Sequence, residues 1–208
     1  MLALALPLMG LLSGCLPTLG VRTLDFQPST AFTQTDAASL LLTQRVAAAQ
    51  FTSIPDALRR APVGSVVVAC WKDTDVSNFW GPCSHVTRKL SEGTLADTWP
   101  SRGANEYPIS LLYARYAVIV LAEDLTGEQV DALRDELGRV RGRPYDLSGK
   151  NETYYCSNLQ NRLNRVLGKP DVVPLNPVWQ AYIPAEALLQ PGVKVLWVGV
   201  RGAQATGN

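Results

Sequence analysis

The chain has 208 residues, of which 47% are apolar and 18% are charged, and its formal net charge is +1. A chain of this length can bury the core of one domain, and its apolar content excludes a disordered protein. The near-neutral charge excludes an electrostatic nucleic-acid-binding surface, because no basic excess is present to attract phosphate. The glycines and prolines follow no period, which excludes collagen-like and solenoid architectures.

The N-terminal segment has the composition of a secretion signal. Residues 1–12 carry no charge and are almost all apolar, but they are too few to cross a bilayer, which takes about 20 helical residues. Residues 12–15 (LSGC) then place small residues before a cysteine. This stretch resembles a bacterial lipoprotein signal. The resemblance implies removal of residues 1–14, acylation of Cys15, a tether over residues 15–35 and anchoring to a membrane of the bacterial cell envelope. A plainly cleaved signal and a buried N-terminal helix are the alternatives.

Hydrophobic patterning predicts both strands and helices in the remainder. Thr126 and Gln129 have the spacing of a capping box, and residues 91–93 (SEG) favour a hairpin turn. The expected strands lie at residues 66–70, 85–90, 94–99, 116–122 and 194–200. The expected helices run from Thr35 or Asp36 to Gln50, from Thr126 to Gly142 and from about Tyr155 to Leu167. Because strands and helices do not alternate strictly, the predicted fold class is α+β, in one domain over residues 36–208.

Cys156 is a candidate nucleophile. It lies where the last predicted helix begins, and the positive end of the helix dipole favours a thiolate over a free thiol, whose pKa is about 8.5. Leu159 and Leu163 share its helical face, so its sulfur is expected to point toward the body of the protein. The alternative is that Cys156 is a small buried core residue, which is the common fate of free cysteines.

His85 is the single histidine of the chain. Any cysteine–histidine chemistry must therefore use it as the base. It begins a predicted strand after a loop rich in aromatic residues, glycine and proline, which is a suitable place for a side chain that faces a cleft. The alternative is a structural histidine that is hydrogen-bonded at a strand edge.

Several motifs together resemble a known family. Residues 64–68 (GSVVV) and 84–86 (SHV), followed later by 142–146 (GRPYD) and 154–159 (YYCSNL), are similar to the circularly permuted NlpC-type papain-like proteins. The similarity is to the YiiX-like branch, which is related to lecithin:retinol acyltransferase. In that family the histidine strand precedes the cysteine helix, as it does here, and the resemblance covers roughly residues 60–200.

The resemblance implies a permuted papain-like fold, with an antiparallel sheet packed against helices and the nucleophile at a helix N-terminus. Cys156 matches the nucleophile and His85 the general base. A third polar residue orients the imidazole from the strand after the histidine, for which Asp97 is the first candidate and Glu92 the second. The oxyanion donors would be the Cys156 N–H group and a neighbouring donor, for which Tyr145 and Tyr154 are the candidates. The sequence departs from the family pattern at Asn158, where a glutamate is usual.

Two further cysteines flank the loop before His85. In an oxidising envelope, Cys70 and Cys83 are expected to form a disulfide that contributes about 2–4 kcal/mol. With Cys15 acylated, Cys156 is then the remaining thiol. A zinc site of both loop cysteines with His85 and Cys156 is the rival, but the spacing lacks the short pairs of structural zinc sites. No metal or cofactor is therefore expected.

The expected function is a thiol-dependent hydrolase of the envelope that acts on an amide bond of cell-wall peptides. Trp71, Trp80 and Trp99 are candidates for lining a peptide or acyl groove, although an aromatic core is an equal reading. The expected partners are a peptide or acyl-amide substrate and a membrane, with no nucleic acid. A lipid acyl hydrolase or acyltransferase, and a non-catalytic envelope-binding lipoprotein, are the alternatives.

Overall fold

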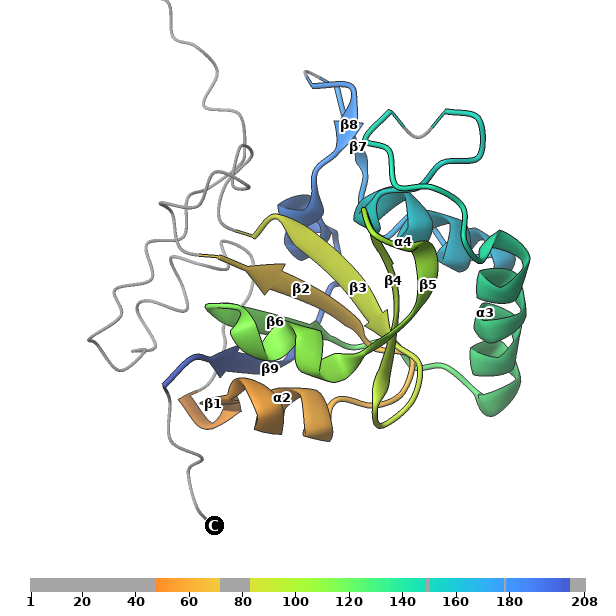
Figure 1. The fold of residues 1–208 in the computed structure, drawn as a ribbon. Helices are drawn as coiled ribbons and strands as arrows, with labels where there is room; N and C mark the ends of the chain where they lie inside the picture. Colours follow the sequence, from red (N-terminus) through yellow and green to blue (C-terminus); the bar gives the residue numbers. More distant parts are fainter. Residues whose placement is uncertain (1–47, 72–82, 149, 178, 203–208) are drawn as a thin grey trace, which may run out of the picture.

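A seven-stranded sheet forms the centre of the computed structural model, which describes residues 48–71, 83–148, 150–177 and 179–202 (Figure 1). The strand order is β1–β9–β6–β2–β3–β4–β5, and all neighbours are antiparallel except β1 and β9. The strands are β1 (Phe51–Ser53), β2 (Val66–Cys70), β3 (His85–Lys89), β4 (Thr94–Trp99), β5 (Gly103–Pro108), β6 (Ala117–Leu121) and β9 (Val195–Val200), and a separate hairpin holds β7 (Leu175–Asn176) and β8 (Ala181–Tyr182). The helices are α2 (Ile54–Arg60), α3 (Gly127–Val140) and α4 (Cys156–Val166), with 3-10 turns η1 (Ala48–Gln50), η2 (Ile109–Ala114) and η3 (Pro184–Leu189). The protein is therefore α+β.

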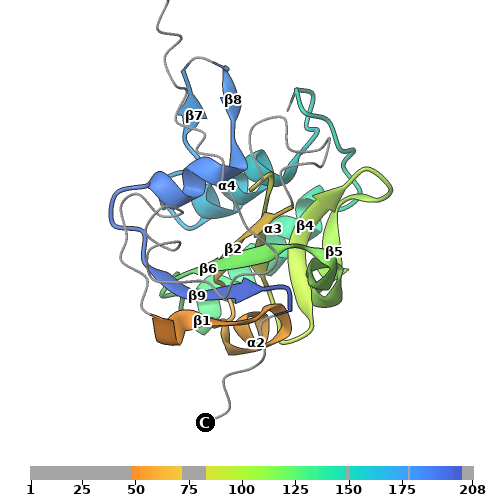
Figure 2. The same ribbon diagram turned by 90° about the vertical axis from the view of Figure 1, so that its left-hand side faces the viewer.

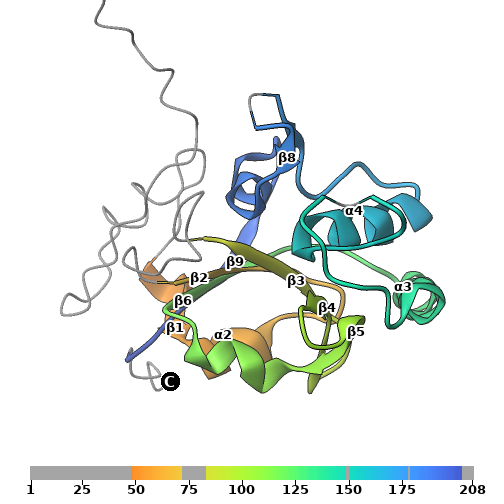
Figure 3. The ribbon, with the colours of Figure 1, turned by 45° about the horizontal axis from the view of Figure 1, so that its top comes forward.

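Helices cover both faces of this sheet, with α2 on one side and α4 on the other (Figures 2 and 3). Burial on both faces of the sheet explains why the sequence of β2 is apolar throughout, because successive side chains of a strand point to opposite faces. Val66, Val68 and Cys70 pack in the cluster that contains the start of α4, whereas Val67 and Ala69 pack in the cluster that contains α2. A strand that is covered on both faces requires a continuous apolar run rather than an alternating one.

The predicted strands are confirmed. Residues 66–70 and 94–99 agree residue for residue, and the other three strands agree to within one residue at each end. Strand β5 was not predicted, because its sequence (GANEYP) lacks the β-branched run that signals a buried strand. Its strand character comes from tertiary pairing with β4, which extends over all six residues.

The helix that begins at Thr126 is confirmed, including the reciprocal capping box with Gln129. Helix α4 begins at Cys156, one residue after the expected start. Helix α2 was not predicted, because Pro55 was expected to interrupt regular structure. Proline is tolerated in the first turn of a helix, and the Ser53 hydroxyl caps this one by accepting the Asp56 N–H group at 3.3 Å.

The N-terminal predictions fall on residues outside the described ranges. These are the signal over residues 1–14, acylation of Cys15, the tether over 15–35 and the helix up to residue 47; residues 48–50 form η1. Among the described residues, no helix combines the length and the apolar character that crossing a bilayer requires.

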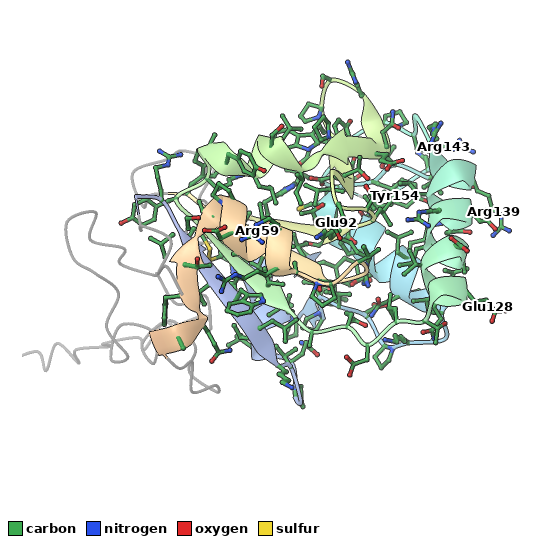
Figure 4. The ribbon with its side chains drawn as sticks, turned by 90° about the horizontal axis from the view of Figure 1, so that it is seen from below. Arg59, Glu92, Glu128, Arg139, Arg143 and Tyr154 are labelled. Carbon is green, nitrogen blue, oxygen red and sulfur yellow. A yellow bond between two sulfur atoms is a disulfide. The ribbon has the colours of Figure 1, made fainter. Side chains whose placement is uncertain are left out.

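A buried lysine joins β3 to α2. The side chain of Lys89 is fully buried, and its ammonium group donates to the carbonyl oxygens of Leu58 at 3.0 Å and Ala61 at 2.7 Å. These carbonyls lie at the C-terminal end of α2, where the helix dipole attracts a cation. Glu92 supplies an ion-pair partner at 2.9 Å but is largely exposed, beside α2 in Figure 4. The helix carbonyls therefore provide the main anchor for the strand that carries His85.

We expect Lys89→Met to lower the free energy of unfolding by about 1–3 kcal/mol, because two buried carbonyl groups lose their donor. Glu92→Ala is the control and should change it by less than about 1 kcal/mol, since surface ion pairs contribute little. Urea unfolding of the full chain measures both values. A Lys89→Met variant as stable as Glu92→Ala would contradict this account of the anchor.

Candidate active site

His85 and Asp97 form a buried pair. His85 is the first residue of β3, Asp97 lies on β4, and Nε2 of the imidazole is 2.7 Å from Oδ2 of the carboxylate. The exposed fraction is 8% for His85 and 0% for Asp97, so water cannot replace this contact. Asp97, the first candidate for the third polar residue, is therefore hydrogen-bonded to the imidazole. Glu92, the second candidate, bonds to Lys89 instead.

The Asp97 carboxylate is held by two further donors. Its Oδ1 accepts the Thr98 N–H group at 2.7 Å, and its Oδ2 accepts the indole N–H group of Trp99 at 3.1 Å. The indole ring of Trp99 also lies beside the imidazole, with the ring centroids 5.4 Å apart. From the sequence, Trp99 was expected to line a groove or to pack in an aromatic core, and its bond to Asp97 was not predicted. The contact could have been predicted, because Trp99 follows Asp97 by two residues on one strand and their side chains therefore lie on the same face.

Cys156 is the first residue of α4 and the free cysteine of the described part of the chain. The helix begins here because the Asn158 side chain accepts the N–H group of Tyr155 at 2.7 Å, which caps the helix. The residue that departs from the family pattern therefore has a capping role, which a glutamate also performs. The thiol is buried, with 4% of the residue exposed. The first N–H groups of a helix have no partner within the helix and can bind an anion.

The side chains of Cys156 and His85 interact. Burial disfavours the charged imidazole, but attraction to Asp97 and Cys156, together with hydrogen bonds to both side chains, outweighs burial and raises the pKa of His85 to about 9. Because Nε2 faces Asp97, Nδ1 is the nitrogen that remains for the thiol. Of the three residues proposed as a triad, His85 is thus hydrogen-bonded to Asp97 and interacts electrostatically with Cys156, and its raised pKa favours the imidazolium at neutral pH.

Tyr145 lies close enough to Cys156 and Asp97 for their charges to act on its hydroxyl group. Burial, followed by the negative charges of Cys156 and Asp97, raises the pKa of Tyr145 to about 12. Its hydroxyl therefore keeps its proton at neutral pH and can donate a hydrogen bond. Tyr145 is placed by a short parallel bridge with Tyr154, in which the Tyr154 N–H group donates to the carbonyl of Pro144 at 2.9 Å.

Tyr154, the other candidate oxyanion donor, has a different partner in the structure. Its hydroxyl accepts a hydrogen bond from Arg162 at 2.7 Å, and its ring packs in the cluster shared with α3 (Figure 4). The next residue points the other way: Tyr155 packs in the Cys156 cluster, and its hydroxyl accepts the Tyr182 N–H group at 2.9 Å. Successive side chains in the extended segment before α4 alternate in direction, so only one of the two tyrosines can face Cys156.

The two loop cysteines form the expected disulfide, with sulfur atoms 2.00 Å apart. The bond closes the loop two residues before His85 and connects it to the end of β2, which lies beside β3. Because a disulfide leaves no thiolate, Cys70 and Cys83 are not zinc ligands here. Among the described residues, no group of three metal-binding side chains is found. Trp80 lies outside the described ranges.

Two of the tryptophans expected to line a groove, Trp71 and Trp99, lie beside Arg115. The guanidinium of Arg115 lies 4.3 Å from the ring centroid of Trp71 and 5.7 Å from that of Trp99. A cavity of about 350 Å³ is lined instead by Asn164 and Val172, toward the opposite end of α4 from Cys156. This cavity is separate from Cys156, His85 and Asp97, none of which lines it.

Comparison with known proteins finds no matching family model, no matching curated protein and no matching solved structure.

Proposed function

We propose that this protein is a cysteine hydrolase with a permuted papain-like fold, which cleaves an amide bond through Cys156. The observation that carries the proposal is an imidazole that is hydrogen-bonded to a buried carboxylate and interacts electrostatically with the Cys156 thiol. The order of the elements supports the same fold, because the histidine strand precedes the cysteine helix and the carboxylate comes from the strand between them in the chain.

The proposed reaction starts from a Cys156 thiolate beside the His85 imidazolium. The sulfur attacks the carbonyl carbon, a C–S bond forms, and the oxyanion accepts hydrogen bonds from the Cys156 N–H group and the Tyr145 hydroxyl. His85 gives its Nδ1 proton to the leaving nitrogen, the C–N bond breaks, and a thioester remains on Cys156. Neutral His85 then takes a proton from water, the resulting hydroxide attacks the thioester, and the acid product leaves as the C–S bond breaks.

The proposed substrate is a cell-wall peptide amide. This choice follows from the lipoprotein-like N-terminus, which would attach the enzyme through Cys15 to a membrane of the bacterial envelope. The test is product analysis after incubation with purified peptidoglycan: the protein should release a new amine and a new carboxyl group, and Cys156→Ala should release neither. A non-catalytic envelope-binding protein would bind peptidoglycan without releasing products.

A second candidate substrate is an acyl lipid. Three exposed large apolar side chains, Leu147, Leu175 and Trp179, lie in the segment before α4 and around the β7–β8 hairpin. The hairpin is attached to the site by the bond from Tyr182 to Tyr155, the residue before Cys156. Apolar groups at this position suit a lipid substrate, and mass spectrometry of phospholipid incubations would detect release or transfer of an acyl chain.

We expect His85→Ala to slow alkylation of Cys156 by iodoacetamide about tenfold or more, because the thiolate loses its charged partner. The full chain with Cys15→Ser serves as the parent protein, since Cys156 is then its one free thiol. Peptide mass spectrometry measures the rate at this residue. Equal rates in the parent and in His85→Ala would refute the catalytic pair.

The charge of His85 gives a second prediction, which concerns pH. An imidazolium beside the sulfur attracts an anionic reagent, so iodoacetate should gain rate relative to iodoacetamide in the parent protein but not in His85→Ala. This preference is expected below the pKa of about 9, where His85 holds its proton, and should disappear as the pH rises through that value. A ratio of the two rates that stays constant over this range would show that His85 carries no charge beside Cys156.

A further inference from the structure

A single carbonyl group connects the three elements that carry the proposed triad. The carbonyl oxygen of Ala96 accepts the Thr87 hydroxyl at 2.9 Å and the side-chain amide N–H of Gln160 at 2.9 Å. Ala96 precedes Asp97 on β4, Thr87 lies two residues after His85 on β3, and Gln160 is one turn along α4 from Cys156. One acceptor thus receives a bond from each of the two neighbouring elements.

The two hydrogen bonds to the Ala96 carbonyl, here called the junction, lie where the regular pairing of β3 with β4 ends. The ladder between β3 and β4 pairs Lys89 with Leu95 and Arg88 with Ala96, and it ends there. His85 and Asp97 lie beyond the last pair, where ladder bonds no longer fix the distance between the two strands. The side-chain bonds to the Ala96 carbonyl lie at this last pair, between the regular ladder and the reactive groups.

Burial makes these bonds difficult to replace. Thr87, Ala96 and Gln160 each have an exposed fraction of 0%. A buried donor that loses its acceptor cannot form a replacement hydrogen bond with water. The side chains of Thr87 and Gln160 are therefore held at the Ala96 carbonyl. Residues four apart on a helix share a face, so fixing Gln160 also fixes the direction of the Cys156 side chain toward the sheet.

We propose that Gln160 and Thr87 are positioning residues, which hold Cys156, His85 and Asp97 at reacting distance through their shared bonds to the Ala96 carbonyl. The inference rests on the proposed function, since it concerns the same triad. Proton transfer requires heavy atoms within about 2.6–3.2 Å, and a displacement of about 1 Å can cost a hundredfold in rate. Removing a bond at the junction should therefore impair the contact of thiol and imidazole before it unfolds the protein.

The chain offers a matched control on the same helix. Asn161 is likewise buried, and its side-chain amide makes two hydrogen bonds, to the backbone N–H and carbonyl groups of Val173 at 2.9 and 2.8 Å. These bonds fix α4 to the segment that follows it and to none of the strands that carry His85 or Asp97. A loss of general stability in α4 can thus be separated from a loss of position.

The test compares Gln160→Met with Asn161→Leu in the full chain with Cys15→Ser. Three quantities are measured: the unfolding free energy, the alkylation rate of Cys156 by iodoacetamide and the pH at which the single His85 imidazole titrates by nuclear magnetic resonance. We expect both variants to lose stability. Only Gln160→Met should lose about tenfold in alkylation rate and titrate at a lower pH than the parent, because contact with the thiol helps to hold the proton.

Thr87 supplies a second pair of variants should Gln160→Met fail to fold. Thr87→Val removes the hydroxyl and keeps the shape, and should lower the alkylation rate several-fold, whereas Thr87→Ser should restore it. The inference is overturned if Gln160→Met and Thr87→Val match Asn161→Leu in alkylation rate and in His85 titration. If His85→Ala leaves the alkylation rate unchanged, the proposed function fails instead, so the two failures are distinguishable.

Discussion

The contact between the His85 imidazole and the Asp97 carboxylate is the interaction on which the site depends. An imidazole buried to this extent would ordinarily lose its proton, because burial disfavours charge. The carboxylate reverses this effect and, through Nε2, also fixes the orientation of the ring. The other nitrogen then remains for Cys156 at the start of α4. Three further features accompany this charged pair. Trp99 and the Thr98 N–H group donate hydrogen bonds to the carboxylate, and Tyr145 keeps its proton because burial and the nearby negative charges raise its pKa.

Hydrogen bonds, rather than apolar contacts alone, attach α4 to the sheet. Gln160 bonds to the Ala96 carbonyl, and Asn164 accepts a bond from the fully buried Arg88. Buried polar groups contribute little net stability, but they have few alternative partners and so specify one arrangement. Burial lowers the pKa of Arg88 to about 10, which still leaves the guanidinium charged at neutral pH. Hydrogen bonds of this kind restrict the position of Cys156 relative to His85 more closely than apolar packing does, because apolar packing tolerates small shifts.

Much of this arrangement could be predicted from local sequence signals. Strand β2 and the capping box of α3 are encoded by short patterns, and Asp97 was the first candidate for the residue that orients His85. The missed features depend on the tertiary structure. Strand β5 is polar and exists through its pairing with β4, and the direction of Tyr154 depends on its packing in the cluster shared with α3 and on its hydrogen bond with Arg162. The junction at Ala96 involves a main-chain carbonyl, which leaves no signal in the sequence.

Titration of the single histidine by nuclear magnetic resonance is the most direct measurement of the central claim. The account predicts that His85 keeps its proton until the pH approaches about 9, and that Asp97→Asn and Cys156→Ala each move the titration to lower pH. Because the chain holds one histidine, the signal needs no assignment. A histidine that titrates near its ordinary value of 6.5 in the parent protein, and does not respond to either substitution, would contradict the account.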